Sequence, residues 1–173
     1  TPPLIFMKAH QLIQAVGPKL QTEIIAYLRN EQRGAYRAAI DTLATQKKLR
    51  PVFIKSKTKE QQATWLLDQM RIKSGDALAE QIIQIWLLKG QSKMLVTFLD
   101  AVGIEHDGQG EVKELPEEIT KEAATKGIKA LLAEYSPKHV GLYMYIFCLQ
   151  KEGGWTGLNE AMTEFPDIQL VAP

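Results

Sequence analysis

Residues 24–41, with the sequence IIAYLRNEQRGAYRAAID, decide the fold class, because their apolar side chains return at the three- and four-residue intervals of a helix. Residues 83–100, which lie 59 positions later, read IQIWLLKGQSKMLVTFLD, and another 59 positions give LYMYIFCLQKEGGWTGLN at 142–159. Few residues are identical among the three segments, but an aromatic residue followed by an aliphatic one recurs at the same place. The corresponding pairs are Tyr27 with Leu28, Trp86 with Leu87, and Tyr145 with Ile146.

This recurrence predicts a repeated unit of three helices. The middle helix is apolar nearly all round in the second and third copies, as in IIQIWLL and LYMYIFCL. Such a helix has to be covered on every side, and neighbouring copies of a stacked repeat provide that cover. We therefore predict an all-α fold of three stacked three-helix units of about 59 residues each, which form one compact helical-repeat domain over residues 1–173. The predicted units are 1–59, 60–118 and 119–173.

A short extended segment is predicted after the third helix of each unit. The three segments are PVFIK at 51–55, GEVKEL at 110–115 and IQLVAP at 168–173. Phe53, Val112 and Val171 stand at corresponding positions in these segments. Each unit is expected to end in such a segment.

The composition is typical of a soluble globular protein, with 45% hydrophobic and 24% charged residues in a chain of 173. The longest strongly apolar run, residues 142–149, is far shorter than the roughly 20 residues that a membrane-crossing helix needs. The first residues show no secretory h-region or basic transit segment, so we expect no targeting sequence in this stretch. The single cysteine, Cys148, excludes an internal disulfide framework, and its apolar neighbours predict a buried thiol. We expect a cytoplasmic protein without a membrane partner.

Charge is distributed unevenly although the whole chain carries only +1. Residues 1–59 carry a net charge of +8, residues 60–118 carry −6, and the remainder carries −1. The basic third could bind phosphates or an acidic protein surface, could be a solvated linker, or could face the acidic third within the molecule. The candidate residues for binding a polyanion or a partner are Arg33, Arg37, Lys47, Lys48, Arg50, Lys55, Lys57 and Lys59.

Three helices followed by an extended pair are also the outline of a winged helix-turn-helix unit. In the first unit, RGAYRAAIDTLATQKK at 33–48 would be the recognition helix and VFIKSKTK at 52–59 the wing. Arg33 and Arg37 would then lie at the start of that helix, where recognition helices approach DNA bases. This outline keeps a nucleic-acid-binding function open.

Residue patterns typical of enzymes and metal sites are lacking. The stretch EHDGQGEVKELPEE at 105–118 has Pro116 where a calcium-binding loop needs a bidentate glutamate. The histidines, His10, His106 and His139, have no metal-ligand spacing. No serine nucleophile motif occurs, and Cys148 has no predicted catalytic partner. We assign no catalytic residue, metal site or cofactor.

These observations favour a non-enzymatic, scaffold-like helical-repeat protein that binds another macromolecule through a charged face. We expect a protein partner, and the alternative is a nucleic-acid-binding or transcription-regulator-like protein that uses the basic first third. The opposite charges of the first and second thirds also allow head-to-tail self-association.

Overall fold

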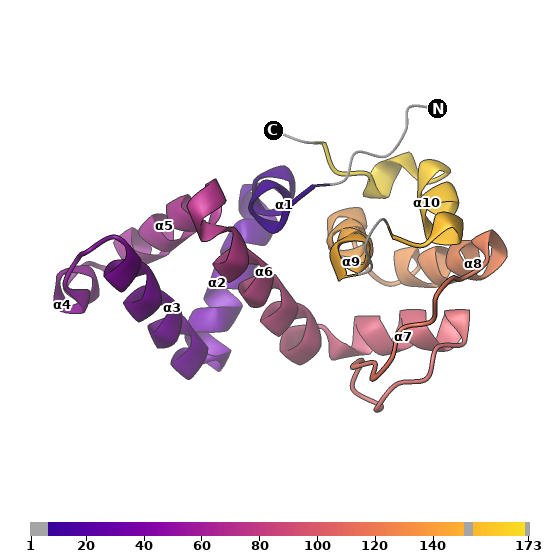
Figure 1. Cartoon of the computed structure of the whole chain (residues 1–173), viewed down its shortest axis with the longest axis horizontal. Helices are drawn as coiled ribbons and strands as arrows, with labels where there is room; N and C mark the ends of the chain where they lie inside the picture. The colour runs from indigo at the N-terminus through magenta and orange to yellow at the C-terminus, as the bar shows by residue number, and fades with distance from the viewer. Residues whose placement is uncertain (1–6, 151–153, 172–173) are drawn as a thin grey trace. The chain divides into compact units, whose positions relative to one another are not determined.

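The computed structural model describes residues 7–150 and 154–171, and every regular element in them is helical (Figure 1). The prediction of an all-α fold is therefore confirmed. Two 3-10 turns, Lys73–Gly75 and Pro166–Ile168, and one π-helical turn, Trp86–Gly90, supplement the α-helices. The α-helices are α1 (Ala9–Ala15), α2 (Pro18–Glu31), α3 (Arg33–Gln46), α4 (Pro51–Lys55), α5 (Lys59–Met70), α6 (Asp76–Ile85), α7 (Ser92–Val102), α8 (Lys121–Leu132), α9 (Pro137–Gln150) and α10 (Thr156–Thr163).

The described part of the chain divides into two compact units. Residues 9–86, with α1 to α6, form one unit, and the other contains α7 to α10 from residue 87 onward together with Met7 and Lys8. Helices α2, α6 and α9 start near the predicted spacing. The boundary between the units, however, falls inside the second predicted copy, so three stacked units of about 59 residues are not confirmed.

The unit of residues 9–86 is held together by buried aliphatic side chains and one buried amide. Leu12, Ile24 and Leu66 are fully or almost fully buried. Gln21 is buried as well, and its Nε2 donates a hydrogen bond to the Ile13 carbonyl at 2.6 Å. Its Oε1 accepts a hydrogen bond of 2.8 Å from Nη2 of Arg71. Both the nitrogen and the oxygen of this buried amide are hydrogen-bonded. The two bonds fix how α2 packs against its neighbours, because leaving the buried nitrogen or oxygen unpaired would cost stability.

The other unit has an aromatic core. Phe98 of α7 lies edge-on to Tyr143 of α9, with ring centroids 5.6 Å apart. Phe147 contacts the Phe98, Tyr143 and Trp155 rings at centroid distances between 4.9 and 5.5 Å. Every residue from 140 to 148 is buried. The helix that the sequence shows to be apolar all round is thus buried over these nine residues.

The segment between α7 and α8 is joined to α10 by side-chain hydrogen bonds. Nε1 of Trp155 donates a hydrogen bond to the Pro116 carbonyl at 2.8 Å. The Glu118 carboxylate accepts hydrogen bonds from the backbone N–H groups of Thr156 and Gly157, each 3.1 Å long. A carboxylate from elsewhere in the chain therefore caps the N-terminus of α10, where free N–H groups and the helix dipole favour a negative charge.

Of the three predicted extended segments, the one at residues 51–55 is wrong. Residues 51–55 form α4, which starts with Pro51 in the first turn and buries Ile54 completely. Residues 110–115 and 168–171 contain no strand, and positions 172 and 173 lie outside the described residues. The physical reason for the helix at 51–55 is that Pro51 suits a first helical turn, where no N–H is needed, and that one turn of helix buries Ile54.

Among the described residues, no helix combines the length and the apolar composition needed to span a membrane.

Candidate functional site

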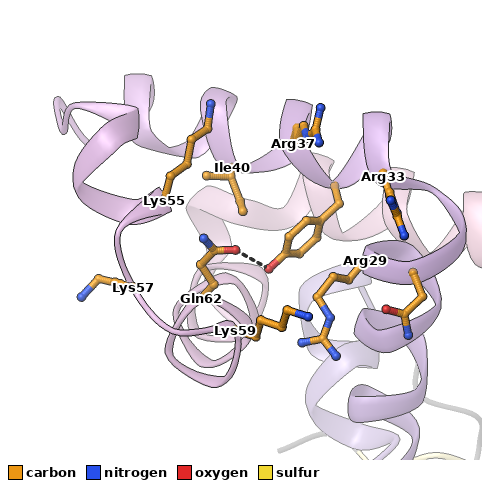
Figure 2. A pocket seen from close by; sticks show the side chains of 10 residues that line it. Arg29, Arg33, Arg37, Ile40, Lys55, Lys57, Lys59 and Gln62 are labelled. Atoms are coloured by element: carbon orange, nitrogen blue, oxygen red, sulfur yellow. Dashed lines mark hydrogen bonds between the residues drawn. The ribbon is translucent and has the colours of Figure 1, made fainter.

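A basic pocket opens in the unit of residues 9–86, between the end of α2, the first half of α3, and the end of α4 with the start of α5 (Figure 2). Its volume is about 700 Å³. Six of its lining side chains are cationic, and none is a carboxylate. The lining residues are Arg29, Asn30, Arg33, Tyr36, Arg37, Ile40, Lys55, Lys57, Lys59 and Gln62.

The arginines of the pocket come from a sharp junction between two helices. α2 ends at Glu31 and α3 begins at Arg33, so Gln32 alone joins them. Arg29 lies in the last turn of α2, whereas Arg33 and Arg37 lie one turn apart on α3. Residues four apart share a helix face, and the junction adds the third arginine from a different direction.

The lysines of the pocket come from the turn between α4 and α5. Lys55 ends α4 and Lys59 begins α5. Thr58 between them caps α5: its Oγ1 accepts the Gln61 N–H, and Oε1 of Gln61 accepts the Thr58 N–H, both at 3.1 Å. This reciprocal capping box fixes the turn that carries Lys57 and Lys59.

Gln62 connects the two walls of the pocket. The Tyr36 hydroxyl donates a hydrogen bond to Oε1 of Gln62 at 2.9 Å, and Nε2 of Gln62 donates to the Ile54 carbonyl at 3.3 Å. One amide thus joins α3, α4 and α5. Because this link holds the backbone on both sides, the cationic side chains start from fixed positions.

Arg29 is the most enclosed of the pocket's arginines. Its Nε is buried and has no hydrogen-bond partner, whereas Arg33 and Arg37 are exposed. Burial raises the pKa of the Tyr36 hydroxyl, and the positive charge of Arg29 opposes that rise with a smaller effect. Tyr36 is therefore protonated at neutral pH, and the Arg29 guanidinium is close enough for its charge to act on the hydroxyl.

Two cations at the rim of the pocket already have partners. Nζ of Lys55 lies 3.2 Å from Oδ1 of Asp41, and both side chains are about half exposed, at 49% each. Nζ of Lys57 lies 5.1 Å from the centre of the Phe53 ring. Contacts this exposed contribute little stability, so they leave both lysines able to turn toward an anion.

The structure brings together five of the eight residues that the sequence proposes for binding. Arg33, Arg37, Lys55, Lys57 and Lys59 all line the pocket. Lys47, Lys48 and Arg50 are exposed but do not line it.

The other three proposed residues lie in the connection from α3 to α4. Lys47 follows α3, and its Nζ donates a hydrogen bond to Oγ of Ser74 at 3.3 Å. The backbone φ angle of Lys48 is positive, at 57°, and Arg50 directly precedes α4. They form an exposed basic surface outside the pocket.

Sequence reasoning missed Arg29, Tyr36 and Gln62 as members of the site. Arg29 stands four positions before Arg33, but the helix break at Gln32 hides that relation from a periodicity argument. Gln62 lies in a different helix and is recognisable only by its contacts. The spacing of Arg29, Arg33 and Arg37 is the one signal in the sequence that could have found the arginine cluster.

The wing of the predicted winged-helix outline is wrong. Residues 52–59 contain most of α4 and the capped start of α5, and no strand. Arg33 and Arg37 do lie in the first two turns of α3, as that outline requires. A DNA-binding function would have to work without a wing.

The two units carry net charges of opposite sign. Residues 9–86 hold 12 lysines and arginines against seven acidic residues, a net charge of +5, whereas the rest of the chain holds nine against 13, a net charge of −4. Within the basic segment 47–59, residues 51–55 form α4 and Lys59 begins α5, so only its remaining residues are connections. The basic excess thus belongs to the folded unit that contains the pocket.

The remaining polar clusters are small. Nδ1 of His10 lies 2.6 Å from Oδ1 of Asp76, and Nε2 of His106 lies 2.7 Å from Oδ1 of Asp100. Over residues 7–150 and 154–171, no group of three His, Cys, Asp or Glu side chains is placed to hold a metal ion. Cys148 is buried, as predicted, and burial raises the pKa of its thiol to about 12.

Comparison of the chain with models of protein families, with curated proteins and with solved structures finds no match in any of the three.

Proposed function

We propose that the chain is a non-enzymatic binding protein that holds an acidic segment of another protein in the basic pocket. The observation that carries this proposal is that six cationic side chains and no carboxylate line one pocket. A concave surface lined by one sign of charge focuses the electrostatic field and attracts ligands of the opposite sign.

The groups in the pocket favour binding over catalysis. Its lining contains no histidine, carboxylate or thiol, the side chains that most often act as general acids, general bases or nucleophiles. The pKa of Tyr36 is raised, which leaves its hydroxyl protonated and poorly suited to act as a base. Charge complementarity is the chemistry that this lining supplies best.

Exposed apolar side chains next to the pocket favour a protein as the partner. Val52 and Phe53 of α4 are 68% and 57% exposed, and α4 carries the pocket residue Lys55 at its end. A peptide segment can place apolar side chains on α4 while its acidic side chains enter the pocket. This combination of an apolar anchor and charged contacts is typical of protein interfaces.

We also propose that the chain is a helical-repeat protein, and the order of the helices supports this. α2, α6 and α9 begin at residues 18, 76 and 137, and each is followed by a further helix that carries an apolar face. A repeat of this kind would give a scaffold with an extended binding surface.

Nucleic acid is the second candidate partner. The observation in its favour is the exposed ring of Phe53 beside the Lys57 ammonium, because aromatic rings stack on bases while cations bind phosphates. Lys47, Lys48 and Arg50 would extend the contact along a strand. The pocket itself favours an acidic protein segment, because a nucleic-acid strand binds along a row of cations and does not need a cavity.

Fluorescence anisotropy with labelled probes tests the proposal. The probes are a short peptide of alternating glutamate and leucine, a single-stranded oligonucleotide and a duplex, each titrated with protein at about 50 mM salt, where screening is weak. We expect the peptide to bind, and the double variant Arg33→Glu, Arg37→Glu to weaken its binding about tenfold or more. Circular dichroism of the variant checks that it folds.

Lys126→Glu with Lys129→Glu is the matched control. Both lysines are exposed on α8, in the other unit, so the control makes the same change in total charge away from the pocket. Equal loss of peptide binding in both double variants would mean that net charge alone is sensed and would contradict the proposal. Tighter, steeply salt-dependent binding of an oligonucleotide would favour the second candidate.

A further inference from the structure

The six cations of the pocket fall into an inner and an outer group. In Figure 2, Lys59 extends toward the Arg29 guanidinium and Arg33 points down from α3 on the same side of that helix, and we call these three the inner group; Arg37 and Lys55 point the opposite way and Lys57 points to the left. The outer lysines contact Asp41 and Phe53. The inner three make no ion pair with any residue over 7–150 and 154–171.

The inner group contains a buried donor that lacks an acceptor. Nε of Arg29 is shielded from solvent and makes no hydrogen bond. Buried N–H groups in folded proteins are almost always paired. A ligand in the pocket cannot reach this enclosed atom, so it would bind the two terminal nitrogens of the half-buried Arg29 guanidinium, which no carboxylate pairs with among the described residues.

Three cations that line one pocket from different helices suit a tetrahedral anion better than a planar one. Arg29 comes from α2, Arg33 from α3 and Lys59 from α5. A phosphate monoester carries up to two negative charges and three acceptor oxygens that point in different directions. A single carboxylate has one charge and two oxygens in one plane, so it can pair with one arginine fork but not with all three cations.

On the basis of the proposed function, we infer that the anion held by Arg29, Arg33 and Lys59 is a phosphate monoester, carried by a phosphoserine or phosphothreonine of the partner protein. The outer cations then contact acidic residues that flank the phosphorylated side chain. A nucleic-acid backbone fits this inner group less well, because each of its phosphodiesters carries a single charge and the charges are spread along the strand.

Two charge-matched peptide pools test the inference in a binding titration. Both pools have degenerate flanking residues, with one phosphoserine at the centre of the first and two adjacent glutamates at the centre of the second. We expect the phosphoserine pool to bind about tenfold more tightly than the glutamate pool, because charge-assisted bonds to a dianion exceed those to separate carboxylates.

Arg29→Lys is the decisive variant. It keeps the positive charge and removes the guanidinium fork, so we expect it to weaken binding of the phosphoserine pool much more than binding of the glutamate pool, and thereby to abolish the preference. Arg37→Lys makes the same chemical change at an exposed, outward-pointing position and is expected to keep the preference. A thermal-unfolding curve for each variant checks that the fold is retained.

The outcomes separate this inference from the function on which it rests. Equal affinity of wild-type protein for the two pools would overturn phosphate recognition and leave acidic-segment binding in place. If neither pool binds but inositol hexakisphosphate does, the phosphate comes from a small molecule, and both the phosphorylated partner and the proposed protein-binding function fail. If none of the three ligands binds, both proposals fall. Retention of the preference in Arg29→Lys would refute the role given to Arg29.

Discussion

Replacement of Gly141 by alanine should destabilise the unit that contains α7 to α10, even though alanine is the better helix former. Gly141 lies in the first turns of α9, and a Cβ atom there would lie well under 3.0 Å from the carbonyl oxygen of Ile168. A backbone oxygen cannot rotate away as the end of a side chain can. α9 and the 3-10 turn Pro166–Ile168 would therefore have to move apart.

The magnitude follows from three contributions. Overpacking of a well-filled site costs about 1–3 kcal/mol, and alanine recovers about 1 kcal/mol of helix propensity. Separation of α9 from the turn also strains the hydrogen bond of 3.3 Å from the Leu170 N–H to the Tyr145 hydroxyl, and a bond of this kind contributes about 1 kcal/mol. The expected net loss is about 1–3 kcal/mol, which lowers the melting temperature of a chain of this size by roughly 2–12 °C.

Gly34→Ala is the matched control for this experiment. Gly34 lies in the first turn of α3, and a Cβ atom there would have no other heavy atom within 4 Å. The same substitution should therefore be neutral or stabilise the protein by up to about 1 kcal/mol. Calorimetric unfolding of both variants decides the question. A Gly141→Ala protein as stable as wild type would refute the close approach of α9 to the turn.

Two further predictions concern titratable groups. Hydrogen bonds from the Gly157 and Thr156 N–H groups lower the pKa of Glu118 below its ordinary value of 4.5, so the stability that its ionised form provides is present above that pH and is lost as the pH falls through the lowered pKa. Denaturation of Glu118→Gln and wild type from pH 7 downward should show a gap that narrows below about pH 4.5, and a gap independent of pH would contradict the cap. Burial raises the pKa of Cys148 to about 12, so a disulfide reagent at about pH 8 should react with the folded protein only as fast as it opens; complete reaction within seconds without denaturant would show that the thiol is accessible.

Helix type and approximate position could be predicted from the sequence because apolar periodicity reports burial directly. The stripe with Tyr36, Ile40 and Leu43 predicts a helix, and all three residues are buried in α3. The segment 51–55 misled the prediction because Val, Phe and Ile favour extended backbone in isolation. Pro51 is the better guide, since proline in the first helical turn carries no N–H that would need a partner.

The basic character of the site could be predicted, but its shape could not. Local lysine density identifies Lys55, Lys57 and Lys59, and it equally selects Lys47, Lys48 and Arg50, which the chain turns away from the pocket. What separates the two groups is the capped turn at Thr58 and the bridge of Gln62. These are contacts between segments that are distant in the sequence, which neither composition nor periodicity reports.

The pocket also sets a balance between stability and binding in the unit that carries it. Six like charges around one cavity repel each other; Asp41 pairs with Lys55, but no carboxylate lines the cavity to neutralise the others. The unit therefore depends on uncharged links such as the Tyr36–Gln62 hydrogen bond to hold α3 and α5 at a fixed separation. Because an anion in the pocket would replace repulsion by attraction, the same charges that weaken the empty unit become the source of affinity once a ligand is bound. A site arranged in this way favours ligands that bring more than one negative charge to the same point.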